Sequence, residues 1–592
     1  MKYAGNLAVI GSGPTSLYLL KHLLDEVVAS GRLIRSVTIF EKEELMGYGM
    51  PFHPKTTDKH NLSNISSEEI PELPETFHHW LLKRDSEELA DWGIEKLEIS
   101  ETAVYGRLAL GCYLRDQYRI IVAGLRAAGI EVHERPNCLV VDIDDLPSEG
   151  HVTVTAGKGQ VERFDAVVIA SGHEWDYGDR PKEGFYSSPW PIFKLLPKEG
   201  EFHNFVIGTL GASLSAFDVV SSLAHRHGEF VRDGNALRFQ PHKEAQGFRL
   251  ALHSADGLLP HLQWDQVEPL REIYRYVTPE NLLALCERPG ILRMATFFDR
   301  VCRPALQGAF RKDGITEMED LLDDDRFGIQ DFVEEMVSRH KYVDSFEGMR
   351  LEMVEARDSV ELHHPIHWKE TLDDLMYCLN FHAELIPAED QWVFRKKVMP
   401  FLMNVIAAMP LSSGETLLAL HEAGVIELVK GRVTVENAAS PEGNTMVSLD
   451  QDGVKTQICY EMFVDCSGHK PMDLDEFPFP SLVSTGAVRE ARAAFANAEE
   501  SENASRSCGD KVIWSGGAPF LRTGGIEVDA AYRIVGEDGK PNMRIRDLAS
   551  PHTSGIRPYS YGLQACEATA AIVVRSWAKD LASEKLQRAM AR

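Results

Sequence analysis

The chain has 592 residues, with 62 lysines and arginines against 90 aspartates and glutamates, so its formal net charge is -28. This charge argues against a broad nucleic-acid surface and against adsorption to anionic lipid, because a polyanion would be repelled over most of the protein. Hydrophobic residues make up 44% of the chain, yet no apolar run reaches the ~20 residues that a membrane-spanning helix needs.

The first predicted elements have the order of a dinucleotide-binding unit: apolar strand 7–10, a glycine turn, a helical pattern over 17–27, and strand 36–40 ending on Glu41. In such a unit the turn wraps a pyrophosphate, and the helix N-terminus offers free N–H groups. An acid at the end of the second strand accepts hydrogen bonds from a ribose diol. A plain strand–turn–helix unit without a ligand is the alternative. The turn residues that we expect to bind the nucleotide are Gly11, Ser12, Gly13, Pro14, Thr15 and Ser16.

The stretch that follows favours FAD over NAD as the ligand of this unit. A simple NAD domain would continue with another helix and strand, but here the chain makes a long irregular excursion over 46–81. An excursion of this kind can form the wall that a flavin ring needs. The cofactor contacts expected from it are Gly47, Tyr48, Gly49, Asn61, Ser63 and Asn64.

Two later segments, 165–173 and 461–469, share an acid, an apolar strand and the tripeptide Ser-Gly-His at one spacing. We interpret each as a strand that returns the chain to a nucleotide domain and crosses over through glycine. On this interpretation the chain leaves and re-enters its FAD domain. Two unrelated core strands with turn glycines are the alternative. The interpretation adds four expected cofactor contacts, Ser171, Gly172, Ser467 and Gly468.

A second strand–turn–helix pattern over 205–220 lies between these segments, and a second unit of this kind in a flavoprotein typically brings NAD(P)H to the flavin. The next strand, 248–254, ends without an acid at the ribose position. Arg249, His253 and Ser254 are therefore candidates to accommodate a 2′-phosphate, which favours NADPH, although NADH and a plain surface role for Arg249 and His253 both stay open. The turn residues expected to bind this second nucleotide are Gly208, Gly211, Ser213 and Ser215.

Residues 265–425 have mainly helical patterns and predict an insert that covers the active site and selects the substrate. The histidines of 363–367 flank a proline without a carboxylate–histidine pattern, so no metal site is predicted. Near the C-terminus, Tyr561, Gly562 and Leu563 open a long helix. Its N-terminus would face the flavin pyrimidine end and stabilise negative charge on the reduced ring, with a plain docking helix as the alternative.

Together these patterns predict an α/β protein with two Rossmann-type dinucleotide-binding domains, a glutathione-reductase-like FAD domain and an NAD(P) domain, and a largely helical insert. The chain runs from its start directly into a strand, without a signal peptide, and its nine cysteines form no Cys-x-x-Cys pair. Both features suit a reducing cytoplasm. The expected domains are 1–180 (FAD, N-terminal part), 181–264 (NAD(P)), 265–425 (helical insert) and 426–592 (return strands and the C-terminal part of the FAD domain).

The chain resembles the bacterial FAD/NAD(P)-binding flavoproteins that are related to the N-hydroxylating flavin monooxygenases. The form Gly-x-Gly-Pro-x-x-Leu is similar to that of ornithine and lysine N-hydroxylases, and the nitrosuccinate-forming aspartate N-monooxygenases have a similar length. The resemblance spans about 1–262 and 390–592 and adds Arg107 to the expected cofactor contacts. It is carried by Gly11 to Pro14 with Leu17, Gly47 to Gly49, Asn61 to Asn64, Arg107 with Gly111 to Arg115, Asp165 to His173, Leu214 to Asp218, and His253 to Pro260.

The resemblance implies that NADPH reduces FAD, that O2 forms a flavin C4a-(hydro)peroxide, and that the amine of a small amino acid such as aspartate takes the distal oxygen. An amino-acid substrate needs a carboxylate clamp, for which Arg303, Arg522 and Arg557 are candidates. No catalytic residue is singled out, because this chemistry needs a water-poor pocket more than a base. The alternatives are an NAD(P)H-dependent flavin reductase or dehydrogenase and a flavin-binding protein without turnover. The expected partners are the amine and O2, without nucleic acid or membrane, and a homo-oligomer is compatible with the sequence.

Overall fold

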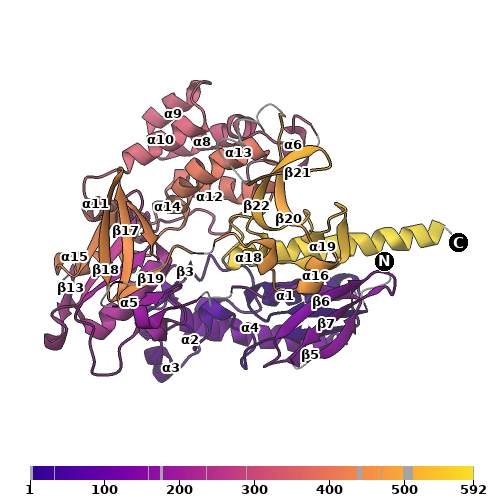
Figure 1. Ribbon diagram of the computed structural model, residues 1–592, viewed down its shortest axis with the longest axis horizontal. Coiled ribbons are helices and arrows are strands. Elements are labelled where there is room, and N and C mark those ends of the chain that lie inside the picture. Colours follow the sequence, from indigo (N-terminus) through magenta and orange to yellow (C-terminus); the bar gives the residue numbers. More distant parts are fainter. Residues whose placement is uncertain are drawn as a thin grey trace.

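The computed structural model describes residues 5–31, 34–157, 159–173, 178–234, 236–288, 290–436, 440, 443–468, 470–497 and 511–590, without the side chains of Ser30 and 581–590. The described chain forms a first α/β unit, a second α/β unit and a helical middle domain. In Figure 1 the first unit lies at the right, the second at the left, and much of the middle domain across the top. None of the described helices is long and apolar enough to cross a membrane.

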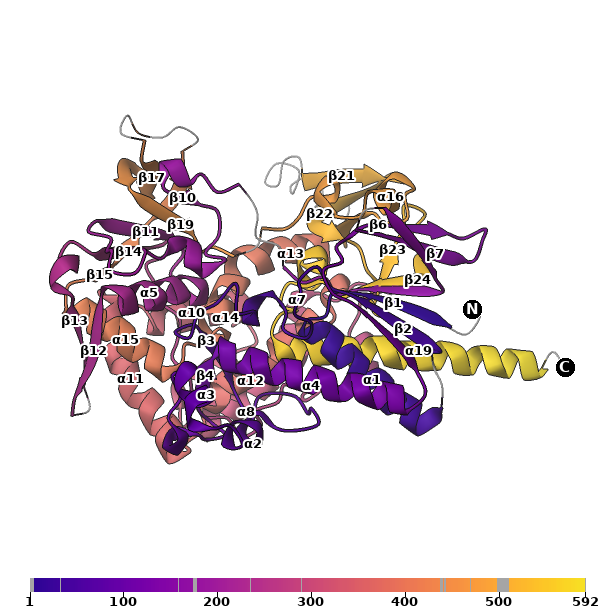
Figure 2. The same ribbon diagram turned by 90° about the horizontal axis from the view of Figure 1, so that it is seen from below.

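The first unit is built on a six-stranded sheet. Its strands in spatial order are β23 (Arg533–Val535), β24 (Pro541–Asp547), β9 (Ala166–Ile169), β1 (Asn6–Ile10), β2 (Ser36–Phe40) and β5 (Glu131–Arg135). All neighbours from β24 to β5 are parallel, and β1 and β9 are almost wholly apolar and buried, as expected for a sheet covered on both faces. On one face α1 (Pro14–Ser30) packs against α4 (Arg107–Ala127) and the C-terminal helix α19 (Leu563–Met590), as Figure 2 shows.

The second unit has a five-stranded sheet that is parallel throughout. Its strands in spatial order are β10 (Phe185–Tyr186), β19 (Met462–Asp465), β11 (Val206–Leu210), β14 (Arg249–Ser254) and β15 (Ile426–Lys430). Helix α5 (Leu214–His227) follows β11, and α15 (Leu411–Glu422) precedes β15. The core of this unit is separate from that of the first.

The two units repeat one topology. In each, a strand, a glycine turn and a helix lead to a second strand beside the first, and a three-stranded antiparallel sheet precedes the strand on its other side. In the first unit these antiparallel strands are β6 (Val140–Leu146), β7 (His151–Ala156) and β8 (Gln160–Phe164), before β9. In the second unit they are β16 (Arg432–Val435), β17 (Thr445–Gln451) and β18 (Val454–Tyr460), before β19.

This repeat corrects the prediction for the second Ser-Gly-His segment. Strand β9 pairs with β1, as expected, but β19 pairs with β11 of the second unit. The two segments are therefore equivalent strands in two different sheets, and 426–465 does not return to the first unit. The chain re-enters that unit only afterwards, through β23, β24 and α19. The sequence could not show this, because short buried parallel strands look alike whichever sheet they join.

The middle domain lies between β14 and α15, at the position where the excursion lies between β2 and α4 of the first unit. The predicted mixed α/β fold with a Rossmann-type unit and a largely helical insert is confirmed. Most helices of the insert enclose a core of their own, which Tyr559 of the C-terminal region joins, whereas α11 packs in the core of the second unit. The insert contains α6 (Pro279–Ala284), α7 (Met294–Phe297), α8 (Arg303–Lys312), α9 (Thr316–Asp323), α10 (Ile329–Arg339), α11 (Ser345–Leu362), α12 (His367–Asn380), α13 (Ala388–Val393) and α14 (Met399–Ile406).

Shorter elements complete the fold. They are β3 (Leu62–Ser66), α2 (Phe77–Leu82), α3 (Ser86–Asp91), β4 (Val104–Gly106), β12 (Gly228–Asp233), β13 (Ala236–Pro241), α16 (Pro480–Ser484), β20 (Glu490–Ala494), β21 (Val512–Ser515), β22 (Ala518–Ile526) and α18 (Ser550–Thr553). Strands β3 and β4 pair with each other within the excursion between β2 and β5, which is otherwise irregular or helical. The excursion brings its residues to the second unit.

Candidate nucleotide and flavin site

The glycine turn after β1 has the geometry that a pyrophosphate site needs. Gly11 has φ +101°, and a Cβ at this position would lie 2.3 Å from the carbonyl oxygen of Ala170. Helix α1 starts at Pro14, with no side-chain cap at Gly13 and no acid in its first turn. Its first N–H groups therefore face no competing carboxylate of their own helix, and the turn can accept an anionic ligand.

Glu41 lies beside this turn, as predicted. One carboxylate oxygen, Oε2, accepts hydrogen bonds from the backbone N–H of Ser12 (3.0 Å) and from its hydroxyl (2.7 Å). The other oxygen accepts from the N–H of Glu43 at 3.0 Å. The Ser12 hydroxyl in turn accepts from the N–H of Gly47 at 3.0 Å, so the end of β2 and the excursion meet at the glycine turn.

A second glycine of the excursion completes this cradle. Gly49 has φ +74°, and a Cβ there would lie 2.7 Å from Cδ of Pro14. Gly13 also has little room for a side chain, since an added Cβ would lie 3.1 Å from Cα of Gly49. These close approaches and the carboxylate of Glu41 fit FAD, which would bring a hydride acceptor to the site. Ser171 and Gly172 follow β9 and lie next to Gly11.

Asn61 and Arg107 have a different role from the predicted cofactor contacts. The amide nitrogen of Asn61 donates to the carbonyl of Asp218 (3.1 Å) and to the hydroxyl of Ser222 (2.9 Å), both on α5. Its oxygen accepts from Thr57 and Asp58, so all of its hydrogen-bonding positions are used within the protein. Arg107 forms an ion pair with Asp218 at 2.7 Å. The prediction is corrected: these residues join the first unit to the second.

The Arg107–Asp218 pair is buried at this junction. Burial raises the pKa of the Asp218 carboxyl to about 7, and the guanidinium of Arg107 opposes that rise. The Arg107 guanidinium also lies 5.1 Å from the ring of Trp190, and its Nε donates to the carbonyl of Leu62. Breaking a buried pair of this kind typically costs about 3–5 kcal/mol, because it leaves a charge without a partner. The pair therefore fixes how the two units face each other.

The second turn repeats the geometry of the first. Gly211 has φ +105°, and its N–H donates to the carbonyl of His253 at 3.0 Å, as that of Gly11 donates to Phe40 at 2.8 Å. Ser213 precedes α5 at the position that Gly13 has before α1, with no side-chain cap and no acid in the first helical turn. Ser215 lies in that turn, and Ser467 and Gly468 follow β19 beside Gly211. This turn can therefore accept a second anionic group.

Three residues predicted for the second nucleotide lie elsewhere. Gly208 is inside β11, where a Cβ would lie 2.6 Å from the ring of Phe463, so it serves strand packing. His253 is buried and its Nε2 bonds the Tyr460 hydroxyl at 2.8 Å; burial lowers its pKa to about 4, which keeps it neutral. Arg249 starts β14, at the sheet edge opposite the glycine turn, and donates to the carbonyls of Gln246 and Phe248.

Ser254 does occupy the expected ribose position, equivalent to that of Glu41. Its hydroxyl donates to Asp256 at 2.7 Å. Lys430, which the sequence did not single out, ends β15 directly beside Ser254. A Cβ on Gly257 would lie 3.1 Å from the Cβ, Cγ and Cδ atoms of Lys430, so the lysine stem follows the same loop. Only the pairing of β14 with β15, across the whole insert, reveals this lysine.

The three arginines predicted to clamp a carboxylate are engaged in other contacts. Arg303 is buried and donates to the carbonyls of Leu322, Asp324 and Phe327 and to Asp299. Arg557 is 1% exposed and pairs with Glu384 of the middle domain. Arg522, on β22, pairs with Glu490 at 3.2 Å and is half exposed. Arg303 and Arg557 therefore stabilise the fold, and the prediction that they clamp a substrate carboxylate is corrected. The sequence could not show this, because their partners lie in other helices and loops.

The C-terminal helix meets the first turn of α1, whereas its predicted position at the flavin pyrimidine end stays a prediction. Gly562 has φ +87° and α19 starts at Leu563. The Thr15 hydroxyl, in the first turn of α1, donates to the thiol of Cys566 at 3.2 Å. The first turns of α1 and α19 are thus in contact. Tyr561 lies beside Met403 of the middle domain, whereas Ser63 and Asn64 lie on β3.

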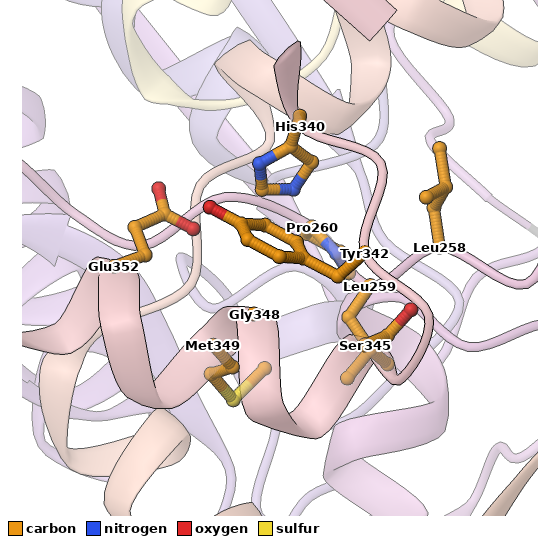
Figure 3. A pocket seen from close by; sticks show the side chains of 9 residues that line it. All are labelled: Leu258, Leu259, Pro260, His340, Tyr342, Ser345, Gly348, Met349 and Glu352. Atoms are coloured by element: carbon orange, nitrogen blue, oxygen red, sulfur yellow. The ribbon is translucent and has the colours of Figure 1, made fainter. Parts of the chain in front are cut away.

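A second polar cluster lies near the ribose loop of the second unit. Among the described residues, His261, His340 and Glu352 have ligand atoms within 4.8 Å of one another, a spacing that could suit a metal. The carboxylate oxygen of Glu352 that accepts from His261 (2.9 Å) also accepts from the ammonium of Lys369 (3.0 Å), which is 3% exposed. Lys369 already neutralises the carboxylate, so we interpret the cluster as structural. His340 and Glu352 line a pocket with residues of α11 (Figure 3).

Two segments of the chain match known protein families. Residues 8–174 match the FAD-NAD(P)-binding family, and residues 278–406 match the YdhS-like middle domain. The first match covers the glycine turn, Glu41 and the first Ser-Gly-His segment, and the second covers the helical insert. The chain therefore contains an FAD-NAD(P)-binding domain, and the predicted cofactor class of FAD with NAD(P)H is confirmed.

Similar proteins were found by sequence and by structure. The Escherichia coli (strain K12) protein named "Uncharacterized protein YdhS" is 26% identical over 482 residues, which are 80% of this chain and 85% of that protein. The ornithine N-hydroxylase of Kutzneria sp. 744 has 12% identity and a TM-score of 0.44 over 98% of this chain and 99% of its own. The L-lysine 6-monooxygenase of Pseudomonas syringae has 14% identity and a TM-score of 0.44, over 97% and 99%.

The two glycine turns predict separable effects of mutation. We expect Gly11→Ala to lower the affinity for FAD at least about tenfold, because a left-handed conformation alone costs ~1–2 kcal/mol and its Cβ meets Ala170. Gly211→Ala should retain FAD and lose the second nucleotide. The FAD content of purified protein and calorimetric titration with NADPH measure the two effects.

Gly31→Ala is the matched control. Gly31 has φ +92° at the far end of α1, but a Cβ there would have no atom within 4 Å. This variant should bind both nucleotides normally. A Gly11→Ala protein with full FAD content would contradict the assignment of the first turn.

Proposed function

We propose that this protein is an FAD-dependent, NADPH-using monooxygenase that oxygenates the amine nitrogen of a small amino acid. The observation that carries the proposal is the pair of equivalent glycine turns, at Gly11 and Gly211, in two units that the buried Arg107–Asp218 pair joins. The first turn would hold FAD, which takes a hydride from the nicotinamide and passes electrons to O2. The second would hold NADPH.

The residues around the first turn would position the flavin. Glu41 would accept hydrogen bonds from the ribose hydroxyls, and the N–H groups at the start of α1 would meet the pyrophosphate. The first turn of α19, which contacts the first turn of α1, would lie near the flavin. The middle domain would cover the flavin and keep water out, as N-oxygenation needs. The balanced reaction is R–NH2 + O2 + NADPH + H+ → R–NHOH + NADP+ + H2O. Aspartate is one candidate substrate within this class.

The preference for NADPH over NADH would come from Ser254 and Lys430. At the equivalent position of the first unit, the carboxylate of Glu41 would repel a 2′-phosphate, whereas Ser254 can donate to one. Lys430 adds an ammonium beside it, and neither His253 nor Arg249 can do so from its observed place. The carboxylate of Asp256, bonded to Ser254, would have to turn away from the phosphate.

Lys430→Ala tests this coenzyme preference. We expect the KM for NADPH to rise about tenfold, as for the loss of a charge-assisted hydrogen bond, and the KM for NADH to stay unchanged. The steady-state rates with both coenzymes measure the effect. Lys455→Ala, an exposed lysine on β18, is the matched control and should change neither value. An equal loss with NADPH and NADH would refute a 2′-phosphate contact.

The activity itself is tested by NADPH consumption in air across a panel of amino acids and amines, with the products analysed by mass spectrometry. We expect one amino acid to accelerate NADPH oxidation about tenfold or more, with one N-oxygenated product per NADPH. The Gly211→Ala variant gives the background rate. If every amine leaves NADPH oxidation unchanged and only hydrogen peroxide forms, the protein is a flavin reductase and the proposal is wrong.

A further inference from the structure

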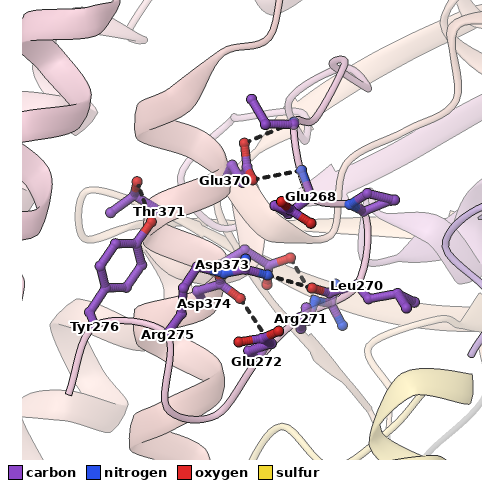
Figure 4. A network of polar contacts seen from close by, with 12 residues as sticks. Glu268, Leu270, Arg271, Glu272, Arg275, Tyr276, Glu370, Thr371, Asp373 and Asp374 are labelled. Atoms are coloured by element: carbon purple, nitrogen blue, oxygen red, sulfur yellow. Dashed lines mark hydrogen bonds and ion pairs between the residues drawn. The ribbon is translucent and has the colours of Figure 1, made fainter. Parts of the chain in front are cut away.

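A pair of arginine–aspartate contacts joins the segment between β14 and the middle domain to α12. Nε of Arg271 donates to Oδ2 of Asp373 at 2.6 Å, and Nε of Arg275 donates to Oδ2 of Asp374. Figure 4 shows the two pairs side by side, with both aspartates on the helix and both arginines on the segment that crosses it. Both pairs join an arginine to an aspartate, yet in only one of them do both carboxylate oxygens have a hydrogen-bond partner.

The Arg275–Asp374 pair is closed. The second oxygen of Asp374, Oδ1, accepts from the backbone N–H of Glu272 at 3.0 Å. The Arg271–Asp373 pair is open, because Oδ1 of Asp373 is buried without a hydrogen-bond partner. Within the described part of the chain, Asp373 is also the one carboxylate that pairs with Arg271, and it does so through Nε. The Arg271 side chain also shares a hydrogen bond with the Tyr559 hydroxyl. A guanidinium has five N–H donors, so Nη–H groups remain for another acceptor.

The surroundings of the open pair favour a ligand that carries both a negative and a positive group. The Arg271 guanidinium lies 5.4 Å from the ring of Tyr559 and 5.9 Å from that of Tyr377. These cation–π contacts restrict the orientation of the guanidinium. Glu69 is close enough to interact with both Arg271 and Asp373, and burial raises the pKa of Glu69 and of Asp373. Two carboxyl groups thus share one guanidinium, and an added ammonium would stabilise their charged forms.

The open pair lies next to the proposed flavin site. The backbone N–H of Arg271 donates to the side chain of Gln564 at 2.7 Å, and that side chain donates back to Pro269 at 3.0 Å. Gln564 is in the first turn of α19, the same turn that brings Cys566 to Thr15 of α1. Glu69 follows β3, whose Ser63 and Asn64 are expected cofactor contacts. The pair is therefore within reach of a molecule that stands against the flavin.

We propose that Arg271 and Asp373 bind the head group of a free α-amino acid. The carboxylate would take the Nη groups of Arg271, and the ammonium would take Oδ1 of Asp373 with help from Glu69. A guanidinium edge beside a free carboxylate oxygen matches the adjacent opposite charges of an amino acid, which neither a simple amine nor a simple acid would satisfy. This inference deepens the proposed function and rests on it in taking the bound amino acid to be the substrate.

The first experiment measures binding to the wild-type holoenzyme by calorimetry without NADPH, so that oxygenation is not required. The probes are the common protein amino acids and ornithine, followed by analogues of those that bind. Cadaverine lacks the α-carboxylate of lysine and β-alanine lacks that of aspartate, whereas the Nα-acetyl forms lack the ammonium. We expect at least one amino acid to bind and both kinds of analogue to bind at least about thirtyfold more weakly.

The second experiment repeats the titration with Arg271→Gln, Arg271→Lys and Asp373→Asn. Each is expected to weaken amino-acid binding at least about tenfold, with the FAD content unchanged. Arg275→Gln and Asp374→Asn are the matched controls, because that pair is closed, and they should leave the amino-acid affinity unaltered. Thermal unfolding of each holoenzyme identifies a variant that fails to fold, and the analogue series on the wild-type protein still decides the question in that case.

Three outcomes would overturn the inference: no amino acid binds, the analogues bind as well as the amino acids, or the control pair matters as much as Arg271 and Asp373. The two proposals fail separately. If an amino acid binds through Arg271 but is never oxygenated, the proposed reaction is wrong and the site stands. If an amine is oxygenated with a KM that Arg271→Lys does not change, the reaction stands and the site is wrong.

Discussion

The proposed function depends on how the two α/β units are joined, and the buried ion pair between Arg107 and Asp218 is a charged contact at that junction. A charge in this setting is stable only while its partner stays in place, so the pair resists any rotation of one unit against the other. Asn61 adds two hydrogen bonds to the same helix, α5, both from its amide nitrogen. A hydride can pass between two nucleotides only over a short distance, so the proposed function requires the two units to stay in one relative position.

The repeated topology explains why one chain can hold two nucleotides. Gly11 and Gly211 have nearly the same φ, and each follows a strand that has a parallel neighbour on both sides. The units differ in the residue at the ribose position, which is Glu41 in the first and Ser254 in the second. This difference is the basis for assigning FAD to the first unit and NADPH to the second in the proposed function. The middle domain is inserted in the second unit, yet it packs on the C-terminal segment of the first. Tyr559 of that segment lies in the core of the middle domain and interacts with Asp373, and Arg557 pairs with Glu384. It thus links both units around the proposed active site.

The sequence predicts those parts of the site that depend on local structure. A strand, a glycine turn and a helix adjoin one another along the chain, so the sequence predicts the turn at Gly11 and the acid at Glu41. It predicts the turn at Gly211 from the same pattern and from its place in a chain with an FAD domain. Residues whose roles depend on distant partners were misjudged. Asn61 and Arg107 carry a motif, but their partners on α5 are more than a hundred residues away, and the buried strand 462–465 gives no sign of which sheet it joins. Lys430 and Arg271 were missed because only the pairing of β14 with β15 and the packing of α12 place them.

The most direct test of this account is an anaerobic titration of the purified protein with NADPH, followed through the absorption of the oxidised flavin. The account predicts that the protein carries FAD and that one NADPH per chain reduces it, in a first-order process whose rate does not depend on protein concentration. An FAD that stays oxidised with excess NADPH, or a rate that rises with protein concentration, would show that the two units of one chain do not bring the nucleotides together.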